Sequence, residues 1–386
     1  ELFDYISEED YDAISDGIID IYTAYEDASV TLQDAQVFDI LKKIPALAKI
    51  APSQDENGTY QISQPMHLIY FSAAVSGGDK KANAVLTNDI NMSGYVFNPI
   101  AHGTRYNGTF DGQQHAITNL VVGDPEFYDA PASAALFNDI ENGTVKNLKV
   151  QSSIYTSSKF AAGLSGYTRN AKIQNCDVAV TINTIVEGDG THGGLIGVNE
   201  TEGTVVENCL INATMLGENT TSCGGVVGWA TNGITINNTL ILSSNYTIST
   251  SSSNTVSRNP DNCTVNNVFY VTQFGDAKGT KVTEDQLASG ETCWKLNGEK
   301  VDDAHWFQTL GKDATPHLYG GSKVWKYGDE YVNSRPNIQL NAFASNLSTA
   351  TNAEQVVVAY TLNAEAASGA INFYAGEELK YSYVLK

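Results

Sequence analysis

The sequence predicts an all-β-dominated chain built on a right-handed single-stranded parallel β-helix, a solenoid, with a helical N-terminal segment and a small β-rich C-terminal segment. Three observations predict this fold class. Short segments centred on Asn recur about every 30 residues, a Gly-rich series recurs at a similar period, and the composition is rich in Gly, Asn, Thr and Tyr. Three short strands in a repeat of this length form one coil of a parallel β-helix.

The Asn-centred segments have an alternation of apolar and polar residues that slips at the Asn. Segments such as KIQNCDV and VVENCLI place apolar residues at the second, fifth and seventh positions. A straight strand cannot do this, whereas a left-handed or bulged Asn returns both halves to one interior. Stacked coils would align the Asn amides in a hydrogen-bonded ladder; the alternative is a set of surface Asn residues in loops. The predicted ladder is Asn119, Asn147, Asn175, Asn208, Asn238 and Asn267.

The five cysteines are an odd number without Cys-x-x-Cys spacing, which predicts neither a zinc site nor a disulfide framework. Cys176 and Cys209 follow the Asn in adjacent coils and would come within range of a disulfide. Because inward Cys normally behaves as a small apolar side chain, we expect unpaired core thiols.

The chain divides into four predicted segments. Residues 1–52 form a helical hairpin, with a capping box at the start of each helix. Residues 53–282 form the β-helix, entered through a cap helix with Ser63 as the N-cap and Pro65 in its first turn.

Residues 283–334 are predicted to cap the C-terminal end of the stack. Thr283 begins a short helix, and the aromatic-rich sequence that follows suits cap packing of Trp306; a sugar-binding platform of Trp306 and Trp325 is the alternative. Residues 335–386 alternate apolar and polar positions, which predicts a β-rich, Ig-like or partial sandwich.

The acidic charge of the chain limits the kinds of partner that it can bind. The chain has 22 Lys and Arg against 44 Asp and Glu, a net charge of -22, which argues against nucleic acid and anionic membranes as partners. No stretch reaches the roughly 20 apolar residues of a membrane helix. The chain begins at Glu1 without Met, so we expect any leader or anchor to be missing from this chain. The expected location, which is inferred only indirectly, is extracellular or at the outer cell surface.

No cofactor is expected, with calcium in the acidic loops left open. Calcium prefers carboxylate and carbonyl oxygens, but the chain has no D-x-[DN]-x-[DN]-G run.

The repeats resemble those of bacterial cell-surface proteins with the GLUG motif, whose repeats read GGLVGxNxGGxIxNCxVxG. The matching residues are AGLSGYTRNAKIQNCDV, GGLIGVNETEGTVVENCLI and GGVVGWATNGITINNTLI, and the resemblance spans residues 57–327. It implies the right-handed parallel β-helix and an adhesin-like surface role. It implies no activity, because the motif is structural.

The stretch GDGTHGGLIG, residues 188–197, also resembles the catalytic histidine motif of polygalacturonase-type glycosidases. Inverting glycoside hydrolysis needs two carboxyl groups about 6.5–9.5 Å apart, which on a β-helix come from neighbouring coils. The repeat register sets His192 beside Ala161 and Cys223, and Asp189 beside Ser158 and Thr220, without a second carboxylate. We therefore predict a corner loop on a scaffold, with no catalytic residues.

The predicted function is an adhesin-like scaffold, a monomer, that recognises a glycan or a host or neighbouring-cell surface protein without catalysis. The alternatives are a polysaccharide-acting lyase or glycosidase and a structural surface spacer. Loops on a rigid scaffold commonly carry binding residues. The candidate contacts, all expected to be exposed, are Phe127, Tyr128, Asp129, Asp189 and His192.

Overall fold

The computed structural model describes residues 51–334, 344–351, 356–362 and 369–385. The predicted helical hairpin falls almost wholly on residues 1–50, outside the described residues. Residues 51–334 belong to one compact unit and residues 335–386 to another.

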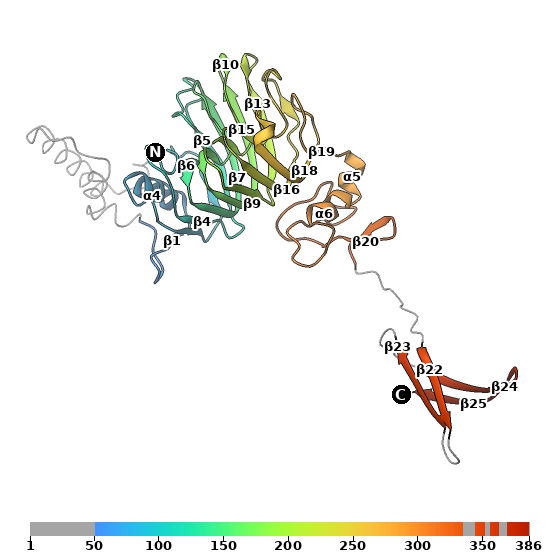
Figure 1. Cartoon of the computed structure of the whole chain (residues 1–386). Helices are drawn as coiled ribbons and strands as arrows, with labels where there is room; N and C mark the ends of the chain where they lie inside the picture. The colour runs from blue at the N-terminus through green and yellow to red at the C-terminus, as the bar shows by residue number, and fades with distance from the viewer. Residues whose placement is uncertain (1–50, 335–343, 352–355, 363–368, 386) are drawn as a thin grey trace, which may run out of the picture. The chain divides into compact units, whose positions relative to one another are not determined.

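The first unit is a parallel β-solenoid of about six turns, which confirms the predicted class of fold (Figure 1). Its longest wall is one sheet in which all strand pairs are parallel. The strands of this wall are β1 (Tyr60–Ile62), β2 (Ala84–Leu86), β3 (Ile90–Asn91), β4 (Thr109–Asp111), β5 (Ala116–Val122), β7 (Thr144–Thr156), β9 (Lys172–Thr184), β12 (Thr204–Glu207), β13 (Leu210–Leu216), β16 (Ile234–Ile241), β17 (Asn245–Tyr246), β18 (Cys263–Tyr270) and β19 (Thr280–Lys281).

Two smaller sheets form the other walls. The Gly-rich series supplies one of them, a parallel four-stranded sheet in the order β15-β11-β8-β6. The other is a pair of short strands, β10 and β14, at a corner of the coils. These strands are β6 (Phe137–Glu141), β8 (Ser165–Arg169), β11 (Ile196–Asn199) and β15 (Val227–Ala230), with β10 (Gly188–Asp189) and β14 (Thr220–Thr221) at the corner.

The predicted Asn bend is present in every repeat. All six residues have φ between 47° and 53°, the left-handed region that Asn tolerates best among residues with a side chain. The amide Nδ2 of Asn175 donates to Oδ1 of Asn147 at 2.9 Å, and that of Asn208 donates to Asn175 at 3.1 Å. Asn267 donates in the same way to Asn238 at 3.2 Å. The bend lets both halves of each strand send side chains into one core.

Asn119 does not share this stack. Its amide donates to Asn91 at 2.9 Å, whereas Asn147 donates to Asp111 at 3.0 Å. The four extra residues Gly112–His115 separate β4 from β5, so β4 pairs with the first half of β7 and β5 with the second half. Asn119 therefore lies beside the second half of β7, about half a strand beyond the position next to Asn147 that the repeat spacing predicts.

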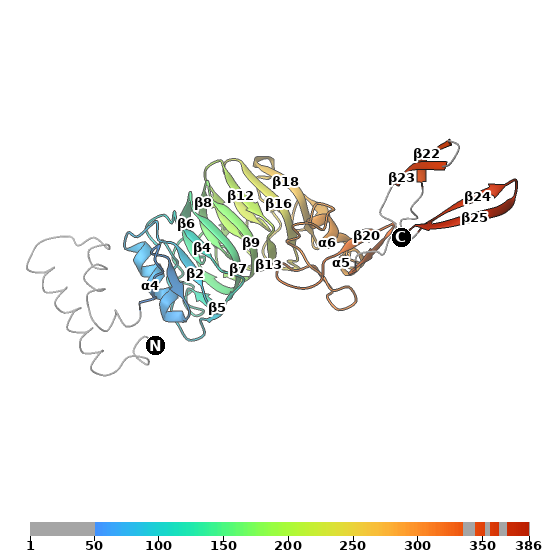
Figure 2. The ribbon, with the colours of Figure 1, turned by 90° about the horizontal axis from the view of Figure 1, so that it is seen from below.

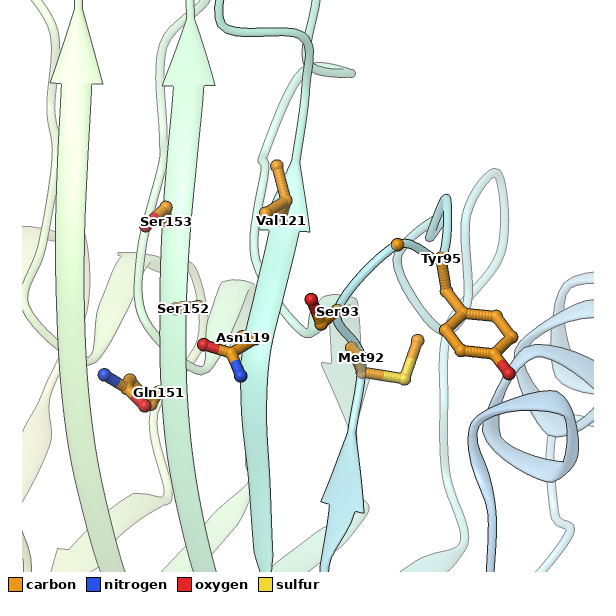
Figure 3. A pocket seen from close by; sticks show the side chains of 9 residues that line it. Met92, Ser93, Tyr95, Asn119, Val121, Gln151, Ser152 and Ser153 are labelled. Carbon is orange, nitrogen blue, oxygen red and sulfur yellow. The ribbon is translucent and has the colours of Figure 1, made fainter. Parts of the chain in front are cut away.

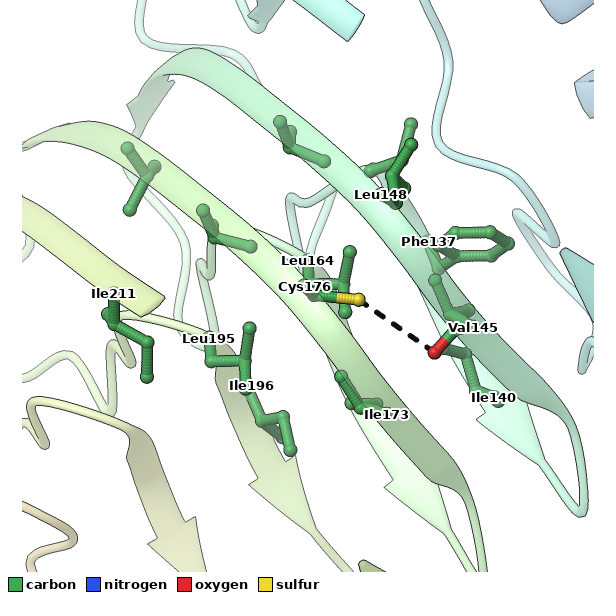
Figure 4. Packing of buried hydrophobic residues seen from close by; sticks show 14 of the residues in the cluster. Phe137, Ile140, Val145, Leu148, Leu164, Ile173, Cys176, Leu195, Ile196 and Ile211 are labelled. Carbon is green, nitrogen blue, oxygen red and sulfur yellow. Dashed lines mark hydrogen bonds between the residues drawn. The ribbon is translucent and has the colours of Figure 1, made fainter. Parts of the chain in front are cut away.

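The interior is a single apolar core of stacked Ile, Leu and Val side chains (Figure 4). All five cysteines lie in the described residues, are buried and are free, as expected for core thiols. Burial raises the pKa of the Cys176 thiol well above its usual value, and a hydrogen bond with Cys209 acts in the same direction. The Cys176 thiol is therefore held in the neutral form.

Helix α4 (Pro65–Ser76) covers the first coils at one end of the solenoid (Figure 2). Leu68, Phe71 and Val75 are buried in the solenoid core. The N-cap is Gln64 and not the predicted Ser63, because Pro65 occupies the first helical position and holds the residue before it extended. Ser63 instead contacts the ring of His67.

The region 283–334 contains helices α5 (Glu284–Ala288) and α6 (Glu291–Leu296) and the hairpin β20 (Trp325–Tyr327) and β21 (Glu330–Val332). Thr283 caps α5 through a capping box with Gln286, as predicted. The region packs on the outer face of the long wall, where Leu210, Leu240 and Phe269 stack in register. It therefore covers a side of the last coils, in contrast to the predicted packing against the end of the stack.

Trp306, fully buried, is the largest side chain of this second core, and Trp325 is half-buried. Trp306 is therefore a packing residue and presents no platform to a sugar.

The second unit contains two antiparallel strand pairs among its described residues. Strand β22 (Ala344–Thr351) pairs with β23 (Val356–Leu362), and β24 (Gly369–Ala375) pairs with β25 (Glu378–Leu385). This arrangement has the antiparallel strands of the predicted β-rich segment.

Two substitutions of Asn208 can separate the contribution of the left-handed bend to stability from that of the amide hydrogen bond. We expect Asn208→Ala to lower the free energy of unfolding by about 2–3 kcal/mol, because it loses a buried hydrogen bond and places a Cβ-bearing residue in the left-handed region. Asn208→Gly, which tolerates that backbone, should lose about 1 kcal/mol less. Denaturant unfolding measures both variants, with Asn212→Ala at an exposed position as the control. An Asn208→Ala variant as stable as the wild type would contradict this role of Asn208.

Candidate functional site

Three glycines of GDGTHGGLIG, Gly193, Gly194 and Gly197, are required by close backbone approach between coils. A Cβ atom on Gly197 would lie 2.6 Å from the carbonyl oxygen of Gly166, and one on Gly228 would lie 2.7 Å from that of Gly197. The same atoms would also overlap the carbonyl oxygens of Phe160 and Thr191, in the loops that cross these glycines. The Gly-rich series is thus a backbone contact surface and belongs to the scaffold.

His192 is fully buried, in contrast to the exposed contact that the sequence predicts. The corner loop folds inward here, and the Nδ1 of His192 accepts a hydrogen bond from the backbone N–H of Ala161 at 3.2 Å. Since Nδ1 is the acceptor, Nε2 carries the proton and donates to the hydroxyl of Thr184 at 3.0 Å. Its coil neighbours are Ala161 and Cys223, as the repeat register predicts. His192 therefore ties coils together and does not reach solvent.

Asp189 is held in an ion network at the same corner. Its carboxylate accepts from Arg258 at 2.7 Å, from Lys159 at 2.9 Å and from the Thr191 hydroxyl at 2.5 Å. These hydrogen bonds overcome the opposing effect of burial and lower the pKa of Asp189 to about 2. Its strand neighbour is Thr221 and not the expected Thr220. The Asp189 carboxylate is thus already paired with two cationic side chains of the same chain.

Phe127, Tyr128 and Asp129 come together in a turn outside the solenoid. Asp124 organises the turn by accepting from the backbone N–H groups of Glu126 and Phe127, and Asp129 accepts from the N–H of Asp124. Phe127 is 69% exposed at the tip. Of the five predicted contacts, only this group remains on the surface and free of charged partners.

Tyr128 connects this turn to the outer face of the long wall. Its ring packs edge-on against Tyr155 of β7, with centroids 5.8 Å apart. The turn of residues 157–160 separates it from the Asp189 corner, because Ser157 N–H donates to Tyr128 and Phe160 N–H donates to Gly190.

The outer face of the long wall has two halves that differ in chemistry. One half carries the stack Lys149, Asp177, Leu210, Leu240 and Phe269, which lies under region 283–334. The other half is solvent-accessible and carries three stacks of uncharged side chains, which we call the neutral face. The neutral face consists of Gln151, Ala179 and Asn212; Ser153, Thr181, Thr214 and Asn245; and Tyr155, Asn183 and Leu216.

A pocket of about 300 Å³ opens at the edge of the neutral face (Figure 3). Its floor is formed by Asn119 and Val121 of β5 and by Gln151 and Ser153 of β7. Its side is the turn of residues 93–95, which leads the chain away from the sheet after β3. In Figure 3, Gln151, Ser153, Asn119 and Val121 lie along the two strands, with the turn beside them.

The pocket residues Gln151, Ser153 and Val121 are not among the contacts that the sequence predicts. The signal available was the period-2 alternation of QSSIYT after the Asn bend, which places Gln151, Ser153 and Tyr155 outward. The turn that forms the pocket's side had no comparable pattern.

Two further findings concern metals and membranes. Within the described ranges, no group of three or more His, Cys, Asp or Glu side chains is placed to hold a metal ion. The expectation of no cofactor, with calcium as the open alternative, stays a prediction. Among the same residues, no helix has the length and apolar character needed to cross a membrane.

The chain matches no protein-family model, and no curated protein matches it. It is similar to a crystal structure of a "putative immunoglobulin A1 protease" from Bacteroides ovatus. The two chains are 16% identical, with a TM-score of 0.49, over 70% of this chain and 95% of that chain.

The glycine contacts make a direct stability prediction. Gly197→Ala should lower the free energy of unfolding by about 2 kcal/mol or more, because the coil spacing must open to admit the Cβ atom. Gly233→Ala is the matched control, since the atom nearest to its Cβ would be Glu202 Cγ at 3.8 Å. Unfolding of the two variants should differ; equal stability would show that the coils do not need the Gly197 contact.

The buried His192 predicts a pH dependence of stability. Burial lowers its pKa to about 4, with Asp189 opposing the shift, so the unfolded chain takes up a proton below about pH 6.5 while the folded chain stays neutral. Stability is therefore full above that pH and is lost as the pH falls towards 4. Between pH 7 and pH 4.5 the loss due to His192 is about 2 kcal/mol.

Unfolding of wild type and His192→Gln at both pH values isolates this contribution. The wild type should lose about 2 kcal/mol more than the variant. His102→Gln, at an exposed position, is the control and should keep the wild-type pH dependence. Identical pH dependence in wild type and His192→Gln would argue against a buried neutral imidazole.

Proposed function

We propose that this protein is a non-catalytic recognition scaffold of the cell surface, adhesin-like in character, which binds a glycan or a surface protein through the neutral face. The observation that carries the proposal is the absence of Asp, Glu, Lys, Arg and His from three stacks of outward residues, on a chain with net charge -22. Amide and hydroxyl side chains on rigid strands provide directional hydrogen bonds without a requirement for counter-charges.

The scaffold supports this role because its recognition surface is rigid. Each outward residue of the neutral face alternates with an inward core residue, such as Ile154 and Ile182, so its position is set by core packing. The exposed Phe127 and the Tyr128–Tyr155 pair extend this surface with aromatic groups of the kind enriched at binding interfaces. The resemblance to GLUG-motif proteins agrees with an extracellular location.

The glycosidase alternative has less support. The two residues that suggested it are both engaged in internal contacts: His192 is buried between coils, and Asp189 is paired with Lys159 and Arg258. General acid–base catalysis would require a group within hydrogen-bond reach of a bound substrate.

Binding to an array of glycans and surface proteins, followed by analysis of released products, tests the proposal. We expect retention of a ligand with no released sugar or peptide. Thr181→Glu, which puts a charge into the neutral face, should weaken binding at least tenfold, about 1.4 kcal/mol, by desolvating an unpaired carboxylate. Thr264→Glu, at an exposed position on β18, is the matched control.

Two results would overturn the proposal. One is turnover of a retained ligand, which would make the chain an enzyme. The other is binding of every ligand with equal strength by Thr181→Glu and wild type, which would remove the neutral face from recognition.

A further inference from the structure

The geometry points to a saccharide subsite in the pocket at the edge of the neutral face, with an uncharged sugar as its ligand. This inference rests on the proposed function and narrows it to one site and one ligand class. Three features support it: the way β3 ends, the open edge of β5 and the chemistry of the lining side chains.

Strand β3 ends because Asn91 redirects the chain. The Oδ1 atom of Asn91 accepts the backbone N–H of Ser93 at 3.0 Å and the amide of Asn119 at 2.9 Å. The N–H of Tyr95 then donates to the carbonyl of Met92, which closes a turn with Gly94 at φ 83°. The turn is thus fixed by hydrogen bonds, and the space beside it is a built feature of the fold.

The early end of β3 leaves part of β5 with one strand neighbour. Ile117 and Thr118 pair with β3, whereas the segment Leu120–Val122 pairs only with β7 among the described residues. Backbone N–H and C=O groups on the open side of that segment are therefore available to a ligand. The segment is only three residues long before the chain turns at Gly123, which is short for docking of a peptide strand.

The side chains in the pocket match a sugar better than a peptide or an ion. Gln151, Ser153 and Ser93 can each donate and accept, as sugar hydroxyl groups also do. Val121 is 39% exposed and gives apolar surface for the C–H face of a sugar ring. No Asp, Glu, Lys, Arg or His lines the pocket, and a net charge of -22 disfavours acidic glycans.

The pocket is also continuous with the rest of the neutral face. Ser153 pairs with Val121 on one side and with Thr181 on the other, and Tyr155 and Tyr128 follow Ser153 along the strand direction. A longer saccharide held at Gln151 and Ser153 would therefore extend towards these two tyrosines.

The test uses the full chain and a printed array of neutral hexose and N-acetylhexosamine oligosaccharides, with uronate- and sialate-containing counterparts. The neutral oligosaccharide with the strongest signal is then titrated calorimetrically against Gln151→Ala/Ser153→Ala. We expect a rise in Kd of tenfold or more. The matched control is Thr264→Ala/Asn266→Ala, which removes a hydroxyl and an amide from exposed positions of β18 outside the neutral face and should change Kd less than twofold.

Asn119 is left unchanged, because its amide and left-handed backbone hold the fold. No neutral glycan binding, preference for the acidic counterparts, or equal Kd in the pocket variant and wild type would overturn the inference. Binding that resists the pocket variant but is lost in Thr181→Glu leaves the recognition scaffold standing and moves the subsite elsewhere on the neutral face. Release of a cleaved product would instead contradict the proposed function itself.

Discussion

The solenoid depends on one backbone constraint: each long strand must change phase once and still face a single core. The left-handed asparagine satisfies it at every repeat, with φ near 50°, and the amide it carries bonds the neighbouring coil in most of the stack. The phase change also fixes which residues point outward. The strand segment after each asparagine therefore presents first the stack under region 283–334, which begins at Lys149, and then the neutral face, which begins at Gln151.

The glycine contacts complete this arrangement on the opposite wall. There the loops before each Gly-rich strand cross directly over the backbone of the next coil, a path that requires residues without Cβ atoms. The glycines of the GLUG-like repeats therefore serve the packing of one coil on the next. The recognition that we propose would therefore use residues that differ from one repeat to the next, such as those of the neutral face.

Much of the fold could be predicted from the sequence because the repeat constrains it strongly. The spacing of Asn175 and Asn208 predicted both their bend and their stacking, and the Thr283 capping box predicted the start of α5. Asn119 was misplaced because the inserted residues Gly112–His115 shift the register without disturbing the local pattern. The side-on packing of region 283–334 could have been expected, since Leu210, Leu240 and Phe269 are apolar at an outward position.

The candidate site was less predictable, because exposure depends on the path of each corner loop. Whether His192 points inward or outward is decided by contacts with Ala161 and Thr184, which lie far from it in sequence. The most direct test of recognition through the neutral face is hydrogen exchange, read by mass spectrometry, with and without the neutral oligosaccharide that binds most strongly on the array. Our account predicts added protection in residues 92–97, 116–123 and 148–156 and none in 187–194; protection confined to 187–194 would contradict it.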